Sequence, residues 1–141
     1  AKYYRLAAEQ GYARAQYSLG ILLEAGRGVE KNGVEAVKWL RKAAEQGHAE
    51  AQHYLGFMYD FGLGVKENDK QAVKWYRMAA EQGNAKSQYS LGIAYEQGNG
   101  VTRDLNEALK YYRLAAEQGE VAAQKAVKRL SSQVAGERES Q

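Results

Sequence analysis

Apolar, small and polar positions follow a helical spacing along the chain, and the whole pattern recurs every 36 residues. The string AAEQG begins at positions 7, 43, 79 and 115, and aligning on it gives three complete units, 12–47, 48–83 and 84–119. Other strings keep the same interval: Leu-Gly falls at 19–20, 55–56 and 91–92, and Gly-x-Gly-Val at 26–29, 62–65 and 98–101. A fixed period of this length indicates a repeat architecture, in which each unit is one supersecondary element.

Each unit is predicted to fold as helix, glycine loop and helix. In unit one the first helix is expected over 13–25, ending at Gly26, and the second from near Asn32 to Gly47. Asn32 and Glu35 have a spacing close to a capping box, in which the short side chain accepts from an exposed N–H and the longer one reaches back. Gly47 supplies the left-handed residue that ends a helix at little cost. The later units repeat these signals at Asn68, Gln71 and Gly83, and at Asp104, Glu107 and Gly119.

The first helices divide into a constant half and a variable half when successive positions are placed about 100° apart. The constant half of unit one contains Ala13, Ala15, Gln16, Leu19, Gly20 and Leu23. The variable half contains positions 14, 17, 18, 21, 22, 24 and 25, with their equivalents in the later units. A glycine inside a helix costs roughly 1 kcal/mol, so Gly20, Gly56 and Gly92 indicate a steric need for no side chain. No unit can bury the constant half alone, so the units are expected to stack into an all-α solenoid of antiparallel helix pairs.

The N-terminal end departs from the repeat. Residues 1–11 match only a second helix, and Tyr3, Tyr4 and Leu6 would there lack a neighbouring helix. This pattern predicts either that the chain is a fragment or that it self-associates through this end.

The C-terminal end departs in a different way. Residues 120–130 begin a fourth unit, but Lys128 stands where the helix glycine of the repeat would be. A long charged side chain at that position suits a solvated outer face, so this segment is predicted to be a terminal cap helix. Residues 131–141 have no apolar period and are expected to be disordered.

Composition excludes several classes of protein. The net charge is +3, but the basic residues alternate with acidic ones and do not form the stripe that is typical of a nucleic-acid binder. No apolar run reaches the roughly 18–20 residues that a membrane-spanning helix needs. The chain has no cysteine, which excludes disulfides and thiolate metal sites and leaves the cellular compartment open.

With A-x-A-Q-x-x-L-G in the first helix, the Gly-x-Gly-Val loop and the A-A-E-Q-G ending, the units resemble the Sel1-like repeat (SLR) family, a relative of tetratricopeptide-repeat solenoids. The resemblance covers about 130 residues and has mild departures, since Ser87 replaces an alanine and Leu23 stands where Tyr59 and Tyr95 occur. In unit one it is carried by Ala13, Ala15, Gln16, Leu19, Gly20, Gly26, Gly28, Ala36, Trp39, Ala43 and Ala44.

The resemblance implies a right-handed superhelix with a concave groove lined mostly by the first helices. It also implies a role as an adaptor or scaffold, since family members assemble signalling, envelope, secretion or protein-degradation complexes, and some bacterial members engage host proteins. A cysteine-rich secreted subset is linked to β-lactam binding, whereas this chain has no cysteine.

The variable half of the first helices is the candidate binding surface. Aromatic side chains flanked by charges suit the recognition of a peptide, because the rings supply contact area and the charges set the register. Tyr17, His53 and Tyr89 are expected to be exposed in the groove, while packing between units is the favoured alternative for the residues at positions 21, 57 and 93. The candidate groove residues are Arg14, Tyr17, Ser18, Glu50, His53, Tyr54, Phe57, Phe61, Lys86, Tyr89 and Ser90.

The sequence gives only weak signals for a metal site, a nucleotide site or a catalytic site. His48 and His53 are five residues apart, a spacing that does not suit a zinc pair on a helix, and His48 is better explained as a helix cap. Gly-x-Gly-Val follows a helix and lacks the third glycine of a dinucleotide loop. Trp39 and Trp75 have the period of core residues. No nucleophile with an activating base can be assembled at helical spacing, so neither a metal, a cofactor nor catalysis is expected.

The sequence therefore predicts a non-enzymatic module that binds a partner protein or peptide in its groove. Two alternatives stay open: an enzyme acting on β-lactam or cell-wall-like ligands, and a purely structural or idealised repeat spacer.

Overall fold

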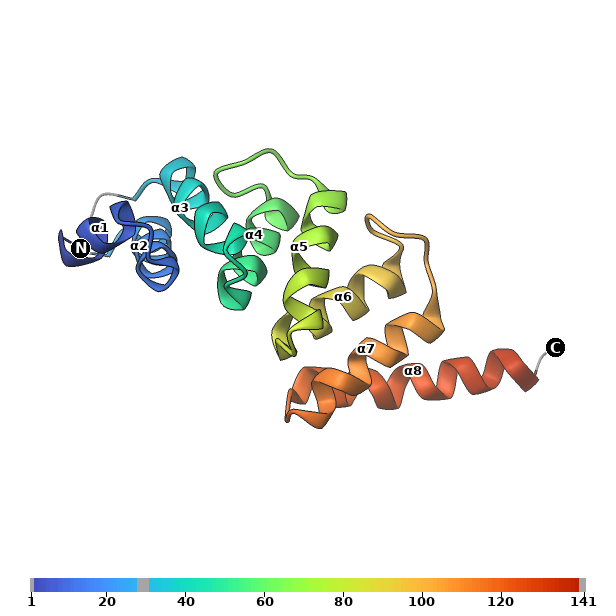
Figure 1. Cartoon of the computed structure of the whole chain (residues 1–141). Coiled ribbons are helices and arrows are strands. Elements are labelled where there is room, and N and C mark those ends of the chain that lie inside the picture. The colour runs from blue at the N-terminus through green and yellow to red at the C-terminus, as the bar shows by residue number, and fades with distance from the viewer. Residues whose placement is uncertain (1, 28–30, 140–141) are drawn as a thin grey trace.

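The computed structural model describes residues 2–27 and 31–139, with side chains as far as residue 136. Gly28 and Val29, which belong to the predicted first loop motif, lie outside the described residues. The described residues form eight helices and no strand (Figure 1). The helices are α1 Lys2–Glu9, α2 Ala13–Ala25, α3 Gly33–Glu45, α4 Ala49–Phe61, α5 Asp69–Glu81, α6 Ala85–Gln97, α7 Leu105–Glu117 and α8 Val121–Glu139.

The helices stack in chain order as antiparallel pairs. Each one packs against the next, from α1 on α2 to α7 on α8, and the two ends of the chain lie at opposite ends of the array (Figure 1). The predicted all-α solenoid of 36-residue helix pairs is thereby confirmed. Since the main contacts among the described helices join successive helices, α2, α4 and α6 occupy equivalent places along the array.

The starts and ends of the helices follow the predicted signals, with one correction. The Asn32 side chain accepts from the backbone N–H of Glu35 at 3.0 Å, and Gly47 has a φ of 90°. The second half of the predicted capping box is wrong, because the N–H of Asn32 donates to the carbonyl of Leu23 at 2.9 Å. The Glu35 carboxylate is free to accept from Arg5 and Trp39 instead. Asn68 and Asp104 repeat the arrangement, with N–H groups bound to the carbonyls of Tyr59 and Tyr95.

Most of the constant half of the first helices is buried, as predicted, while Ala13, Tyr59 and Tyr95 are half-buried. Leu19, Leu55 and Leu91 are fully buried. A Cβ built on Gly56 would lie 2.8 Å from Cδ1 of Tyr76, closer than van der Waals contact allows. The helix glycines are therefore required because a side chain of the following second helix lies directly against the backbone.

Buried glutamines explain why the repeated strings contain this residue. The Nε2 of Gln52 donates to the carbonyl of Ala44 at 3.1 Å, and its Oε1 accepts from Gln82 at 2.8 Å. Gln52 is 1% exposed, so its amide would be costly to bury without these partners. The neighbouring units repeat the pair as Gln16 with Gln46, and as Gln88 with Gln118.

The C-terminal helix is longer than predicted. The sequence predicts a cap over 120–130 and a disordered tail over 131–141, but α8 continues to Glu139. Val134 extends the apolar stripe of Leu130 by one turn and packs against the same core cluster, and the Ser132 hydroxyl donates to the carbonyl of Lys128 at 3.3 Å. The prediction of disorder is therefore wrong as far as residue 139, and residues 140–141 lie outside the described part.

At the other end, Tyr3 is 85% exposed and Leu6 51% exposed. Self-association through these side chains stays a prediction.

Candidate functional site

The variable residues of the first helices line a groove that crosses α2, α4, α6 and the residue before α8. The groove contains two adjoining hollows of about 410 and 430 Å³. Both are bordered by His53, Lys86 and Glu120. The first hollow is completed by Tyr17, Glu50, Tyr54, Asn84 and Ala85. The second hollow is completed by Phe57, Asp60, Phe61, Tyr76, Tyr89, Ser90 and Ile93.

Most of the candidate residues predicted from the sequence come together here. Arg14 and Ser18 line neither hollow; Arg14 is exposed on α2 and Ser18 is half-buried. The predicted residues that do line the groove are Tyr17, Glu50, His53, Tyr54, Phe57, Phe61, Lys86, Tyr89 and Ser90.

The boundary of the variable half needs a correction. Met58 belongs to that half by alignment with position 22, but it is fully buried, and Ala94 at the next equivalent position is 7% exposed. These side chains are buried in the core clusters between units, so the surface that faces the groove is narrower than predicted.

Aromatic rings form a continuous row along the groove. The ring centroids of Tyr17 and Tyr54 are 6.3 Å apart, those of Tyr54 and Phe57 are 5.9 Å apart, and those of Phe57 and Phe61 are 4.7 Å apart. Phe61 is 60% exposed, which is unusual for a phenylalanine. The sequence favours packing for position 57, and Phe57 is half-buried against its neighbouring rings while also bordering the second hollow.

His53 lies deeper than predicted. Its Nδ1 is 2.8 Å from the Ser87 hydroxyl oxygen, and its ring centroid is 5.5 Å from that of Tyr76. Burial, together with the positive charge of Lys86, lowers the pKa of His53 to about 4. The imidazole is therefore neutral at pH 7 and contributes a ring and a hydrogen bond to the groove, but no charge.

His48 acts as the predicted cap. Its Nδ1 accepts from the backbone N–H of Ala51 at 3.1 Å at the start of α4. Its ring also lies 4.9 Å from that of Tyr17, so the cap supports one wall of the first hollow.

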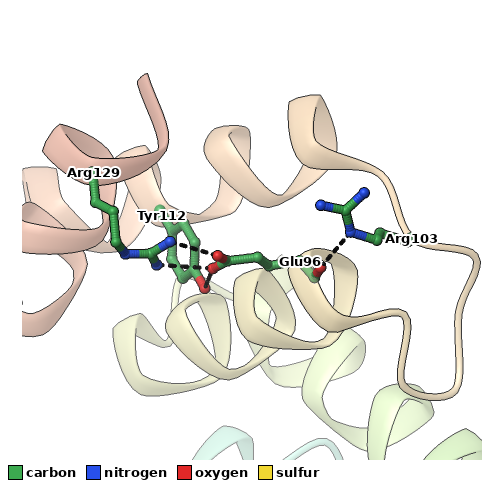
Figure 2. Close-up of polar contacts among 4 residues, drawn as sticks. All are labelled: Glu96, Arg103, Tyr112 and Arg129. Atoms are coloured by element: carbon green, nitrogen blue, oxygen red, sulfur yellow. Dashed lines mark hydrogen bonds and ion pairs between the residues drawn. The ribbon is translucent and has the colours of Figure 1, made fainter. Parts of the chain in front are cut away.

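Two carboxylates on the groove side have tyrosine partners. Asp60 on α4 accepts from the hydroxyl of Tyr76 at 3.1 Å. One repeat later, Glu96 on α6 accepts from the hydroxyl of Tyr112 at 2.7 Å. Figure 2 shows that Glu96 also accepts two hydrogen bonds from the guanidinium of Arg129 on α8, at 2.5 and 2.9 Å. The first pair borders the second hollow, and the second pair fixes the cap helix.

Four residues that border the hollows were not among those predicted from the sequence: Tyr76, Asn84, Ala85 and Glu120. Glu120 was assigned only to the cap, although it aligns with His48 and Asn84 and so shares their place at the start of a first helix. The repeat register could have identified it. Tyr76 comes from a second helix and aligns with Leu40, so no signal in the sequence marked it as part of the groove.

Within the described part of the chain, no group of three or more His, Cys, Asp or Glu residues is placed to hold a metal ion. The described helices also include none that is long and apolar enough to cross a membrane. The side chains that line the two hollows offer aromatic contact, hydrogen bonding and charge pairing.

The comparisons with known proteins agree with the fold. The family model for the Sel1 repeat matches residues 1–12, 13–48, 49–84 and 85–120. These units begin one residue later than those read from the AAEQG string. A search of curated protein sequences found no match.

Solved structures are similar over most of the chain. A protective antigen present in uropathogenic Escherichia coli strains, displaying an SLR fold, is 48% identical with a TM-score of 0.85, covering 86% of this chain and 26% of that chain. A Sel1 repeat protein from Oxalobacter formigenes is 48% identical with a TM-score of 0.84, covering 89% of this chain and 52% of that chain. The cysteine-rich protein B of Helicobacter pylori, 24% identical with a TM-score of 0.69 over 89% of this chain and 90% of that chain, shares the fold.

The chain thus spans 26% and 52% of the lengths of the two more identical proteins. The repeat strings, the helix pairs, the family model over residues 1–120 and the two matches at 48% identity lead to one assignment. The chain belongs to the Sel1 repeat family.

Proposed function

We propose that the chain is a non-enzymatic interaction module whose groove binds a segment of a partner protein. The observation that carries this proposal is the row of partly exposed rings from Tyr17 to Phe61, bordered by charged side chains on both hollows. Aromatic residues combine a large contact area with few rotatable bonds, and they dominate the binding energy of protein interfaces.

The stacked helices favour such a role energetically. Tyr54 and Phe57 project from α4, whose backbone is fixed by packing against α3 and α5. A groove that is already formed loses little conformational entropy when a partner binds, so more of the contact energy appears as affinity. Glu50, Lys86 and Glu120 at the borders supply charges of both signs that would orient the bound segment.

The proposal is tested by selecting peptides from a random linear display library on the whole chain. Selected peptides should lose at least about tenfold in affinity for the variant Tyr54→Ala/Phe57→Ala, because this truncation removes two central rings of the row. The matched control is Val34→Ala/Met78→Ala, which truncates two exposed apolar residues outside both hollows.

Circular-dichroism melts of both variants would show that the fold is retained. Equal affinity of the peptides for the two variants, or no enrichment of any peptide, would contradict binding in the groove.

A further inference from the structure

Two carboxylates occupy equivalent positions in neighbouring repeats. Asp60 and Glu96 lie one repeat apart on α4 and α6, and their tyrosine partners Tyr76 and Tyr112 also lie one repeat apart. Each tyrosine ring lies against a helix glycine, which fixes the position of its hydroxyl. Both sites therefore pair a carboxylate with a phenol from the following second helix, with an aspartate in the first site and the longer glutamate in the second.

The chain fills one of these sites itself. Arg129 projects from α8 and binds both oxygens of Glu96, with its guanidinium beside the Tyr112 hydroxyl (Figure 2). The hydrogen bonds from Arg129 are the largest cause of the lowered pKa of Glu96, and the carboxylate in turn raises the pKa of Arg129. A bidentate pair of this kind is among the strong charge-assisted interactions in proteins.

The equivalent site one repeat earlier is open. The position that aligns with Arg129 is Ile93, whose side chain has no hydrogen-bond donor for the Asp60 carboxylate. In the described part of the chain no basic side chain lies within ion-pair distance of Asp60, although Lys86 borders the same hollow. Burial raises the pKa of Asp60, and Asp69 adds to that effect, in contrast to the lowered pKa of Glu96.

The hollow beside Asp60 suits a flat cation on an apolar stem. Its volume is about 430 Å³, and the rings of Phe57, Phe61 and Tyr89 border it. The face of an aromatic ring attracts a guanidinium, and apolar walls can cover the methylene stem of an arginine. His53 on the same border is neutral at pH 7 and does not compete for the carboxylate.

Resting on the groove function proposed above, we infer that the hollow at Asp60 binds an arginine side chain of the partner segment, as the chain's own Arg129 binds Glu96. The guanidinium would donate to the free oxygen positions of Asp60 beside the Tyr76 hydroxyl, and its stem would lie against the rings of the second hollow. Arginine is favoured over lysine because a planar fork can address the carboxylate and stack on a ring together, whereas an ammonium acts as a point charge.

The test uses the peptides selected on the whole wild-type chain. The enriched sequences are expected to share an arginine, and replacing it with alanine should weaken binding at least about tenfold, with lysine retaining part of the affinity. Asp60→Asn, which keeps an acceptor for Tyr76, should cause a similar loss. The matched control Glu45→Gln removes a carboxylate from the exposed end of α3, outside both hollows, and should change affinity less than about twofold.

The possible failures are distinguishable. Peptides that need Tyr54 and Phe57 but share no arginine, or that bind Asp60→Asn as tightly as the wild type, would overturn the arginine site and leave the groove function standing. If no peptide is enriched, the groove function and the arginine site are both overturned.

Discussion

A methyl group added at a helix glycine should destabilise the solenoid, although glycine to alanine ordinarily stabilises a helix by about 1 kcal/mol. At Gly92 the new Cβ would lie 2.6 Å from both Cδ1 and Cε1 of Tyr112. Carbon atoms prefer a separation of about 3.5–4.0 Å, so the ring must move by about 1 Å. Tyr112 is 1% exposed and its hydroxyl is held by Glu96, so the ring has little freedom to move.

The magnitude follows from these opposing effects. Overpacking of a buried site typically costs about 1–3 kcal/mol, and loss of the hydrogen bond to the Glu96 carboxylate adds about 1.5 kcal/mol. Subtracting the helix-propensity gain of about 1 kcal/mol leaves Gly92→Ala less stable than the wild type by about 1.5–3.5 kcal/mol.

Substitution with alanine at the three helix glycines should lower the free energy of unfolding by different amounts, in a fixed order. The Cβ at Gly56 would lie 2.8 Å from the ring of Tyr76, which makes that substitution slightly milder than Gly92→Ala. At Gly20 the nearest atom is Cγ of Leu40, also at 2.8 Å, but a leucine side chain can change rotamer where a hydrogen-bonded ring cannot. Gly20→Ala should therefore cost least.

The assay is urea denaturation followed by circular dichroism, with Gly136→Ala as the matched control. Gly136 lies in α8, and a Cβ there would meet no atom within 4 Å, so this substitution should be neutral or stabilising. Steric crowding at the helix glycines would be refuted if Gly92→Ala were as stable as Gly136→Ala, or if Gly20→Ala destabilised the fold most of the three.

Three further predictions concern the buried polar groups. Gln52→Leu should cost about 1–3 kcal/mol by leaving backbone and side-chain partners unpaired, and less in a Gln82→Ala background, as a double-mutant cycle in urea would show. The pKa of His53 is lowered from 6.5 to about 4, so the unfolded chain binds more protons between these values. Stability should then fall by up to about 3 kcal/mol from pH 6.5 to pH 4, a loss that His53→Gln removes from the pH dependence of the urea midpoint. A double-mutant cycle of Ile93→Arg with Asp60→Asn, measured by urea denaturation, should show a favourable coupling energy between the introduced guanidinium and the Asp60 carboxylate.

The fold could be predicted because its signals are local and repeated. Asn32 caps α3 through a residue three positions away, and Gly47 ends it through its own φ, so neither depends on distant contacts. The helix glycines added a packing signal, because their cost would not recur at a fixed interval without a steric reason. The face that packs followed from these positions, whereas the edge of the groove surface did not, because Met58 and Ala94 are buried.

The predictions that proved wrong depend on contacts between residues that are distant in the sequence. The Glu35 side chain was expected to bind its own helix start, but Arg5 from α1 and the indole of Trp39 occupy it. The extension of α8 depends on whether Val134 finds a core cluster to pack against, which the residues 131–141 alone do not show. Trp75 aligns with Trp39, yet Gln71 replaces the glutamate there, and the indole N–H of Trp75 has no partner in the described part of the chain.

Departures from the repeat, more than the repeat itself, set the chemistry of the groove. In unit one the second-helix position of the site is Leu40, so the tyrosine that partners Asp60 and Glu96 in the later units has no equivalent there. In the last unit Arg129 closes the site from within the chain. Only the Asp60 site combines a tyrosine partner, an aromatic hollow and, among the described residues, no bound cation. A chain of identical units would offer the same site three times, whereas among the residues that the structure describes the proposed arginine site, with its tyrosine partner and aromatic hollow, occurs once, at Asp60.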